Sequence, residues 1–285
     1  MSLFFNNSQK NLDSKVKGTN KSFFVFADRN TVLKNIPTKS KILEIGVYQG
    51  ANAEFLLNHT DLSELHLVDT WALKSFQEML DNKGDFQVGM PMKISVVNKM
   101  KEQLMLLCKE YRGEDNPSVA FEFVYKSVLE KFKDKKNVHI YRQKSVDAVT
   151  SFKSDFFDVI YVDGDHSFNA VLNDLLLYES KLKSGGIFIG NDYLLSENDD
   201  FFHYGVLSAV NQFCKTRNFN LLLVTYGEYA DFVLYKNFSP FVNKFLQNLI
   251  DSELPMISMD GGNLFNYKNS YYLKSNGTKF FIPTI

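Results

Sequence analysis

Two apolar runs of this chain end on oxygen-bearing side chains that together could hold a metal ion. Asp163 ends the run FDVIYVD, and Asn191 with Asp192 ends the later run GIFIGND. If both runs are parallel strands of one sheet, their carboxyl ends meet at the same crevice. Three oxygen ligands without sulfur suit Mg²⁺, Mn²⁺ or Ca²⁺ and are a poor set for zinc. The alternative is that these acids only cap the loops that follow the strands.

A histidine stands close to the first of these acids. His166 follows Asp163 by three residues, and its near-neutral pKa would suit it to take a proton beside a metal-bound hydroxyl. The alternative is a structural hydrogen bond. Asp165 could orient His166 or cap the next helix, and both roles stay open. His203 lies in a Phe-rich loop, where core packing or exposure is expected.

The stretch KILEIGVYQGANAEFLL, residues 41–57, predicts a different kind of site. It reads as a buried strand, a tight turn and a helix start, the usual build of a nucleotide pocket in an α/β sheet. Gly46 and Gly50 allow the backbone to turn sharply and a ligand to approach it. Glu44 would repel a pyrophosphate and attract a ligand with an amino group. The turn therefore favours S-adenosylmethionine over NAD.

The next predicted strand supplies further contacts for such a cofactor. Asp69 ends the run LHLVD, where an acid commonly accepts hydrogen bonds from both ribose hydroxyls, although it could be a solvated turn acid. Thr70 follows it as a second cofactor contact. Trp71 could cover the adenine or belong to the core. Ser145, after the third strand, could contact adenine, cap a helix, or do both.

These residues require a sheet whose strands alternate with helices. Strands are expected at 41–45, 65–69, 137–143, 157–163 and 186–192, followed by a closing hairpin within 220–237. The pattern predicts an α/β fold, a Rossmann-like doubly wound seven-stranded sheet that is mainly parallel, with an antiparallel closing strand.

The chain is expected to divide into three parts. Residues 1–40 form a loose arm and a leading helix within 23–36, and residues 41–238 form the main domain. Residues 74–135 form a helical insertion between strands two and three, which could be a lid, an oligomer contact or a plain elaboration. Residues 239–285 form a C-terminal extension without a recognisable period.

Composition narrows the class of protein. A net charge of −1 and 45% hydrophobic residues give no electrostatic footprint for nucleic acid or anionic lipid. Two cysteines are too few for a disulfide framework, which favours a reducing cytoplasm. No segment has the roughly 20 apolar residues that cross a bilayer. A soluble cytoplasmic protein is expected, without nucleic-acid or membrane partners.

The motifs EIGVYQG, LHLVDTW, YVDGDHSF and GGIFIGNDY resemble those of class I S-adenosylmethionine-dependent methyltransferases, over residues 40–236. The first two motifs are similar to the superfamily in general. The last two resemble the metal-dependent O-methyltransferases that act on sugars of macrolides and related glycosylated products. The resemblance implies an O-methyltransferase that uses S-adenosylmethionine and a divalent cation such as Mg²⁺, with a sugar or glycoside as acceptor.

The resemblance also implies roles for individual residues. Asp163, Asn191 and Asp192 would hold the metal, and His166 would be the base. The sequence departs from the sugar-modifying pattern at Asn191, where an acid is usual. An amide still offers a carbonyl oxygen, but one negative charge fewer should loosen the ion.

Three other functions compete with this expectation. The first is a metal-independent methyltransferase whose acids only structure loops. The second is an NAD(P)-dependent oxidoreductase, which Glu44 in the glycine turn opposes. The third is a non-catalytic binding or assembly subunit with the same fold, with partner contacts through residues 74–135.

Overall fold

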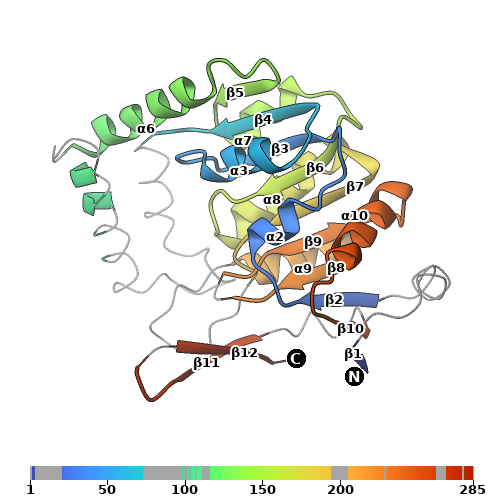
Figure 1. Cartoon of the computed structure of the whole chain (residues 1–285). Coiled ribbons are helices and arrows are strands. Elements are labelled where there is room, and N and C mark those ends of the chain that lie inside the picture. The colour runs from blue at the N-terminus through green and yellow to red at the C-terminus, as the bar shows by residue number, and fades with distance from the viewer. Residues whose placement is uncertain are drawn as a thin grey trace.

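A computed structural model gives the architecture of the chain (Figure 1). It describes residues 2–3, 21–72, 98, 102, 104–106, 108–110, 116–193, 205–227, 229–260, 268–277 and 279–284. His203, most of the arm before residue 21, and residues 73–97 of the expected insertion lie outside these ranges.

The predicted seven-stranded sheet forms the centre of the molecule. Its strands lie in the spatial order β5-β4-β3-β6-β7-β9-β8, and all are parallel except β9, which runs antiparallel to β7 and β8. The strands are β3 (Lys41–Ile45), β4 (Glu64–Asp69), β5 (Val138–Arg142), β6 (Phe157–Val162), β7 (Leu182–Gly190), β8 (Asn220–Thr225) and β9 (Phe232–Tyr235). The mainly parallel sheet and its closing hairpin are therefore confirmed.

The predicted strand count is too low, because three more strands extend the sheet beyond β8. Strand β2 (Lys21–Val25) pairs in parallel with β8, β10 (Met256–Asp260) pairs antiparallel with β2, and β1 (Ser2–Leu3) pairs antiparallel with β10. The described sheet thus has ten strands. Strand β11 (Lys268–Leu273) and strand β12 (Lys279–Thr284) form a separate antiparallel pair.

The leading helix expected within 23–36 is only partly correct. The apolar residues Phe23, Phe24 and Val25 are buried and belong to β2, whereas the helix α2 covers only Arg29–Leu33. β-branched and aromatic side chains favour a strand when both faces of a sheet are covered. Asp28 begins α2 by accepting a hydrogen bond from the Thr31 backbone N–H at 2.8 Å.

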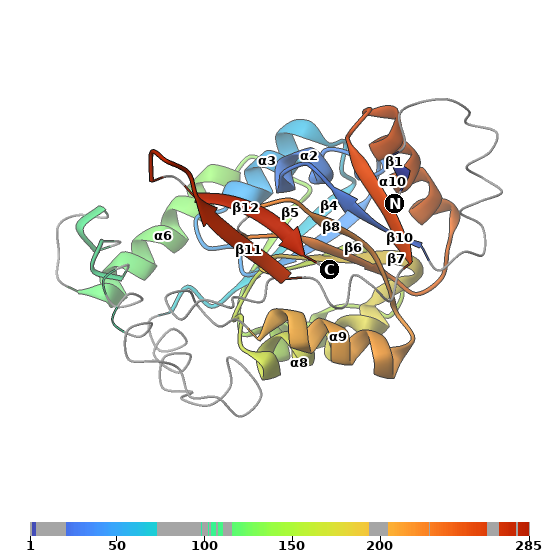
Figure 2. The same ribbon diagram turned by 90° about the horizontal axis from the view of Figure 1, so that it is seen from below.

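Helices cover both faces of the sheet, as the doubly wound prediction requires. One face carries α2, α3 (Ala51–His59), α6 (Pro117–Phe132) and α10 (Pro240–Asp251). The other carries α7 (Ser145–Ala148), α8 (Phe168–Tyr178) and α9 (Val206–Arg217). Short 3-10 helices η1 (Val149–Ser151) and η2 (Glu179–Lys181) follow α7 and α8. Figure 2 shows α8 and α9 on the opposite side of the sheet from α2 and α3.

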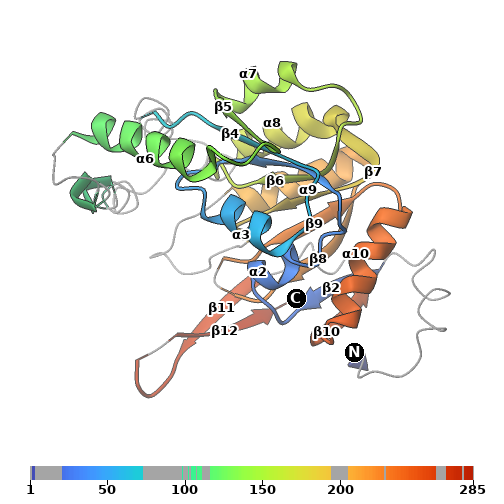
Figure 3. The same ribbon diagram turned by 45° about the horizontal axis from the view of Figure 1, so that its top comes forward.

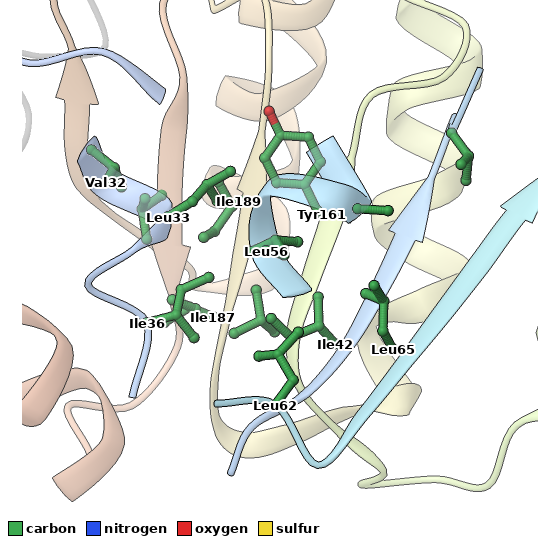
Figure 4. Packing of buried hydrophobic residues seen from close by; sticks show 14 of the residues in the cluster. Val32, Leu33, Ile36, Ile42, Leu56, Leu62, Leu65, Tyr161, Ile187 and Ile189 are labelled. Atoms are coloured by element: carbon green, nitrogen blue, oxygen red, sulfur yellow. The ribbon is translucent and has the colours of Figure 1, made fainter. Parts of the chain in front are cut away.

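The face that carries α2, α3, α6 and α10 is held by a core that extends to the carboxyl ends of the strands. Leu33 of α2 and Leu56 of α3 pack with Ile42 and Ile189 of the sheet, and each of them is buried (Figure 4). The Tyr161 ring belongs to the same core, and its hydroxyl points away from the aliphatic side chains (Figure 4). The Tyr161 hydroxyl is therefore a buried polar group directed toward the ends of the strands.

Helix α6 is the described part of the expected insertion between β4 and β5. It begins at Pro117 after the cap Asn116, and Val124 and Val128 are buried in the same core as α3. Figure 3 shows α3 and α6 along the same flank of the sheet. A further part of the insertion, within residues 98–110, is helical where it is described.

Candidate active site

The functional side chains gather at one edge because the strands that carry them run in the same direction. Strands β3, β4, β6 and β7 are parallel neighbours, so the residues that follow them share the carboxyl edge of the sheet. Strand β9 is antiparallel to β7, which brings Asp231, just before β9, to the same edge. Strand β2 brings Arg29 there from the amino-terminal side, because it is parallel to β8.

The two glycines of the turn after β3 are required by their surroundings. Gly46 has a φ of +87°, and a Cβ there would lie 2.0 Å from the carbonyl oxygen of Asp163. Gly50 has a φ of +72° at the N-cap of α3, where a Cβ would lie 3.0 Å from the Phe132 ring. Left-handed backbone and lack of space both exclude a side chain at Gly46. The turn therefore lies directly against the end of β6.

Asp69 ties the glycine turn to the end of β4. Its Oδ2 accepts hydrogen bonds from the backbone N–H groups of Val47 and Tyr48, both at 2.9 Å. Its Oδ1 accepts a hydrogen bond from the Trp71 backbone N–H at 2.8 Å. Since an ionised carboxylate has about four acceptor sites, further capacity remains. The structure thus gives Asp69 an organising role at the position predicted for ribose contact.

Trp71 lies in the core beside this turn. Its side chain is buried, its Nε1 donates a hydrogen bond to the Tyr48 carbonyl at 2.7 Å, and its ring meets Tyr125 of α6 at 5.1 Å. This is the core placement weighed against contact with adenine, which stays a prediction. The neighbouring Thr70 places its carbonyl 3.4 Å from Nε of Arg142.

Ser145 connects the loop after β5 to helix α8. It is the first residue of α7, whose N-cap is Lys144, so the helix-cap alternative for Ser145 is wrong. The Ser145 hydroxyl donates a hydrogen bond to Asp174 at 2.5 Å. Burial raises the pKa of Asp174 to about 7, against the effect of this hydrogen bond. Contact of Ser145 with adenine remains a prediction.

His166 lies between the two acids that were predicted to bind a metal. Its Nδ1 is 2.8 Å from Oδ2 of Asp192, and its Nε2 is 3.3 Å from Oδ1 of Asp163. Burial alone would lower the pKa of His166, but its hydrogen bonds to Asp163 and Asp192 outweigh burial and raise the pKa to about 10. At neutral pH this side chain is therefore an imidazolium that pairs with both acids.

Asn191 and Asp192 follow β7 in an unusual conformation. Asp192 has a φ of +60°, which places a non-glycine residue in the left-handed region. The Asn191 amide donates a hydrogen bond to Oδ1 of Asp192 at 2.8 Å. This bond directs the Asn191 Nδ2 away from other acceptors, and the buried Asn191 Oδ1 has no hydrogen-bond partner.

A second cation, missed in the sequence, lies on the other side of Asp163. Arg29 places Nη1 3.2 Å from Oδ2 of Asp163 and Nε 3.4 Å from Oδ1 of Asp231. Tyr161 donates a hydrogen bond to the same Asp231 oxygen at 3.1 Å. Burial raises the pKa of Asp231 to about 7, although Arg29 opposes the rise. Asp231, the acid in the run ADFVLY, was a signal in the sequence, because a charged residue is unusual beside a buried strand.

Glu44 is buried close to this cluster. Burial raises its pKa to about 8, Asp163 contributes to the rise, and Asn52 with Arg29 opposes it. Without a cationic partner Glu44 is largely protonated at neutral pH. The carboxyl predicted to attract an amino group is thus held neutral, and its contact with such a group stays a prediction.

Buried polar atoms without a hydrogen-bond partner are concentrated at this edge. Within the described residues the affected side chains are Glu44, Asn52, Asn191 and Asp231, with Asn52 lacking partners for both amide atoms. All four lie at the ends of β3 and β7, in the first turn of α3, or directly before β9. Because native proteins satisfy nearly all buried polar groups, this concentration marks the place where a polar ligand would bind.

Two of the three predicted metal ligands, Asp163 and Asp192, are joined through His166. The third is the Asn191 amide, and binding of an ion by these three residues stays a prediction. In the described part of the chain, three His or Glu ligand atoms that all lie within 4.8 Å of one another occur at Glu64, His66 and His139, on β4 and β5.

Comparison with known proteins identifies the class. The profile of the family described as "Methyltransferase domain" matches residues 43–193, more than half of the chain. The chain therefore belongs to this methyltransferase family, which agrees with the expected class of methyltransferase. The matched residues include the glycine turn, Asp69, Ser145, Asp163 and the Asn191–Asp192 pair.

Solved structures give distant likenesses of fold. Spermidine synthase from Thermotoga maritima is 14% identical, with a TM-score of 0.43, over 75% of this chain and 60% of that one. A SAM-dependent methyltransferase from Aquifex aeolicus is 12% identical, with a TM-score of 0.45, over 73% and 88%. This chain spans about three fifths of the spermidine synthase chains. No curated protein matches it.

None of the helices in the described ranges is both long and apolar enough to span a bilayer.

Proposed function

We propose that this methyltransferase transfers the methyl group of S-adenosylmethionine to a hydroxyl of a small polar acceptor, of the sugar or glycoside class. The observation that carries the proposal is the concentration of unsatisfied buried polar atoms beside the glycine turn. The amino-acid part of the cofactor and a hydroxyl-rich acceptor offer donors and acceptors for such atoms.

The cofactor is proposed to lie over the glycine turn. Gly46 and Gly50 let the backbone turn tightly after β3, packed against Asp163 and Phe132. Glu44 would ionise against the cofactor ammonium, because a nearby positive charge favours the carboxylate. Asp69 holds the turn through two backbone N–H groups and retains acceptor capacity for a ribose hydroxyl. Thr70, Trp71 and Ser145 remain the proposed contacts for the rest of the nucleoside.

The acceptor is proposed to lie beside Asp163 and His166. A methyl sulfonium is already activated, so the main task of the protein is to position the acceptor oxygen in line with it and exclude water. His166 is proposed to receive the acceptor proton. In the described state it already holds a proton between Asp163 and Asp192, so it must release that proton before it can act as a base.

A divalent cation such as Mg²⁺ fits part of this site. Asp163, Asn191 and Asp192 would hold it, and the buried Oδ1 of Asn191 is a carbonyl oxygen without a protein partner. Carboxylate and amide oxygens are suitable ligands for such an ion. When bound, the ion would lower the pKa of the acceptor hydroxyl and fix its direction.

A metal-independent methyltransferase is the second candidate, and one observation favours it. His166 already supplies a positive charge between Asp163 and Asp192, and Arg29 supplies another beside Asp163. These two cations balance the acids without an ion. In that case His166 and Arg29 would orient the acceptor through the acids that they contact.

The test combines cofactor binding with methyl transfer. Titration with S-adenosylhomocysteine should show binding to the chelator-treated protein, and release of S-adenosylhomocysteine should report transfer to a panel of glycosides, phenols and amines. Activity that is lost on chelation and restored by Mg²⁺ supports the metal-assisted reaction. Activity that survives chelation selects the second candidate, and lack of any cofactor binding by folded protein would contradict both.

Matched variants separate the acids from general loss of structure. Asp192→Asn should reduce the transfer rate at least tenfold while the affinity for S-adenosylhomocysteine changes little. Asp165→Asn is the control, because Asp165 accepts a hydrogen bond from the Ser167 backbone N–H at 2.8 Å, which an Asn side chain can also accept. Equal loss of cofactor affinity and rate in Asp192→Asn would argue against a separate acceptor site.

A further inference from the structure

We propose that Glu64, His66 and His139 form a second metal site, for a borderline divalent ion such as Zn²⁺, away from the methyl-transfer site. Each of the three offers a ligand atom, and these atoms all lie within 4.8 Å of one another. Glu64 and His66 lie on β4, and His139 lies on β5. The proposal does not depend on the proposed acceptor or on Mg²⁺.

The strand register explains why these side chains meet. β4 and β5 are parallel neighbours, and His66 and His139 are directly paired residues. Glu64 precedes His66 by two residues, so the alternation of side chains along a strand places both on the same face of the sheet. Glu64 is the first residue of β4, whereas Asp69 at the carboxyl edge is its last. The cluster therefore lies toward the opposite end of the strand from the cofactor turn.

The distances already approach those of a coordination sphere. Nε2 of His66 is 3.1 Å from Oε2 of Glu64, and the His66 and His139 rings are stacked with centroids 4.6 Å apart. Tetrahedral bonds of about 2.0–2.1 Å place ligand atoms about 3.3 Å apart. The His66 and His139 rings would have to rotate out of their stack to point the three atoms at one ion. Two imidazoles and one carboxylate are a zinc-type set, and they leave a fourth position for water.

The surroundings of His66 hold its ring in place for this role. The Tyr141 hydroxyl lies 3.1 Å from Nδ1 of His66, which leaves Nε2 to face Glu64. Phe152 and Phe157 pack edge-on against the ring at 5.6 Å and 5.2 Å. A hydrogen bond to the second ring nitrogen is the usual way in which a metal-binding histidine is oriented.

Lys41 is the one described cation that competes for this cluster. Its Nζ is 2.6 Å from Oε1 of Glu64, and it lies 4.3 Å from the centre of the Phe156 ring. The lysine occupies the carboxylate oxygen that faces away from His66, so Oε2 remains for the ion. Its positive charge should nevertheless weaken binding. Removal of the charge in Lys41→Met is therefore expected to tighten metal binding several-fold.

An ion at this position would join β4 to β5, which is the last strand on that side of the sheet. Ligands on two strands that bind one ion stabilise the folded state over the unfolded state. The expected consequence is a rise in the melting temperature with Zn²⁺. The same ion would stabilise the strands that lead to Asp69 and to Ser145.

The experiment uses the full chain, freed of any histidine tag and of metal by chelation. Zn²⁺ titration should show one site per chain, and Co²⁺ should give the visible absorption of a four-coordinate complex. His139→Ala and Glu64→Gln should each weaken Zn²⁺ binding at least tenfold. His59→Ala is the matched control, because His59 lies on α3, where its Nδ1 contacts the Phe55 carbonyl.

Each outcome decides the proposal. His66 is buried, so its variants could fail to fold, whereas His139 of β5 is exposed and is the better position to change. Binding that persists in His139→Ala and Glu64→Gln, or no binding at all by the wild-type chain, would overturn the site. Binding that is retained in an Asp163→Asn and Asp192→Asn double variant supports it, since that variant alters only the carboxyl edge.

Discussion

Nδ1 of His166 lies 2.8 Å from Oδ2 of Asp192, and this contact joins the loop after β6 to the end of β7. The same imidazole reaches Asp163 through its second nitrogen. One side chain thus links the two strand ends on which the predicted catalytic chemistry depends. When His166 is protonated, its positive charge pairs with the Asp163 and Asp192 carboxylates. When it is neutral, these carboxylates are available to a ligand.

The first prediction concerns the proton on His166. Because Asp163 and Asp192 raise its pKa to about 10, His166 should stay protonated from pH 6 to pH 8 in the ligand-free protein. Asp192→Asn removes one of the two charges and should lower that pKa toward the ordinary value of about 6.5. The His166 pKa of the wild-type protein and of Asp192→Asn can each be measured from the imidazole proton resonances in a pH titration. A wild-type His166 that titrates near pH 6.5 would contradict the bridge.

The second prediction concerns Glu44 and the cofactor. The pKa of Glu44 is raised to about 8, and a bound ammonium should lower it. Cofactor binding at pH 7 should therefore release a proton, and affinity should rise with pH until about 8. Calorimetry in two buffers with different ionisation enthalpies measures the release.

Glu44→Gln should abolish this proton release and reduce affinity roughly 10- to 100-fold, the size of a charged hydrogen bond. Glu54→Gln is its control, because Glu54 is exposed on α3 and pairs with Lys131 at 2.8 Å. If Glu54→Gln and Glu44→Gln weakened the cofactor equally, a specific role for Glu44 would be lost.

The third prediction separates two causes of a glycine requirement. Gly46 and Gly277 have similar φ values of +87° and +79°, but only Gly46 lacks room for a Cβ. Gly277→Ala should cost only the backbone strain of about 1 kcal/mol. Gly46→Ala should destabilise the protein by about 3 kcal/mol or more, because the Cβ meets backbone. Urea unfolding compares the two; equal costs would show that steric contact with Asp163 is unimportant.

The fourth prediction uses the buried acid of α8. The pKa of Asp174 is about 7 in the folded protein and 3.8 as its ordinary value, so the folded state binds more protons between these values. Its contribution to stability is therefore present at low pH and is lost as pH rises toward 7. The free energy of unfolding of Asp174→Asn should gain about 1–3 kcal/mol on that of wild type between pH 5 and pH 8.

Chemical denaturation at the two pH values measures this difference. Asp155→Asn serves as the comparison, since Asp155 is exposed and its substitution makes the same change of side chain. A pH profile of Asp174→Asn that is parallel to the wild-type profile would show that Asp174 is not protonated in the folded state.

The parts of the fold that could be predicted are those with local signals. The glycine turn and Asp69 were found because a strand, a turn and a helix start follow one another within a short stretch. The helix α10 was missed although its signal was present. Ser239 caps it, Pro240 begins it, and Val242, Phe245, Leu246 and Leu249 recur at helical spacing on its buried side.

Other parts depended on contacts that sequence spacing does not reveal. Arg29 and Asp163 are separated by 134 residues and meet only because β2 joins the far side of the sheet. The strand β2 was hidden because its apolar residues run straight into the helical segment after it. The bridge between Asp163 and Asp192 was likewise unpredictable, since convergence of strand ends does not say which side chain fills the space between them.

The junction of β2 with β8 has a consequence for how far the chain can be shortened. Because Arg29 follows directly on β2, a protein trimmed beyond α2 would lose an edge of its sheet and also the guanidinium that neutralises Asp163 and Asp231. Asp231 would then lose its ion pair with Arg29, and Asp163 would keep only its contact with His166. The amino-terminal strand and helix are thus part of the same site, and any shortened form of the protein should retain them.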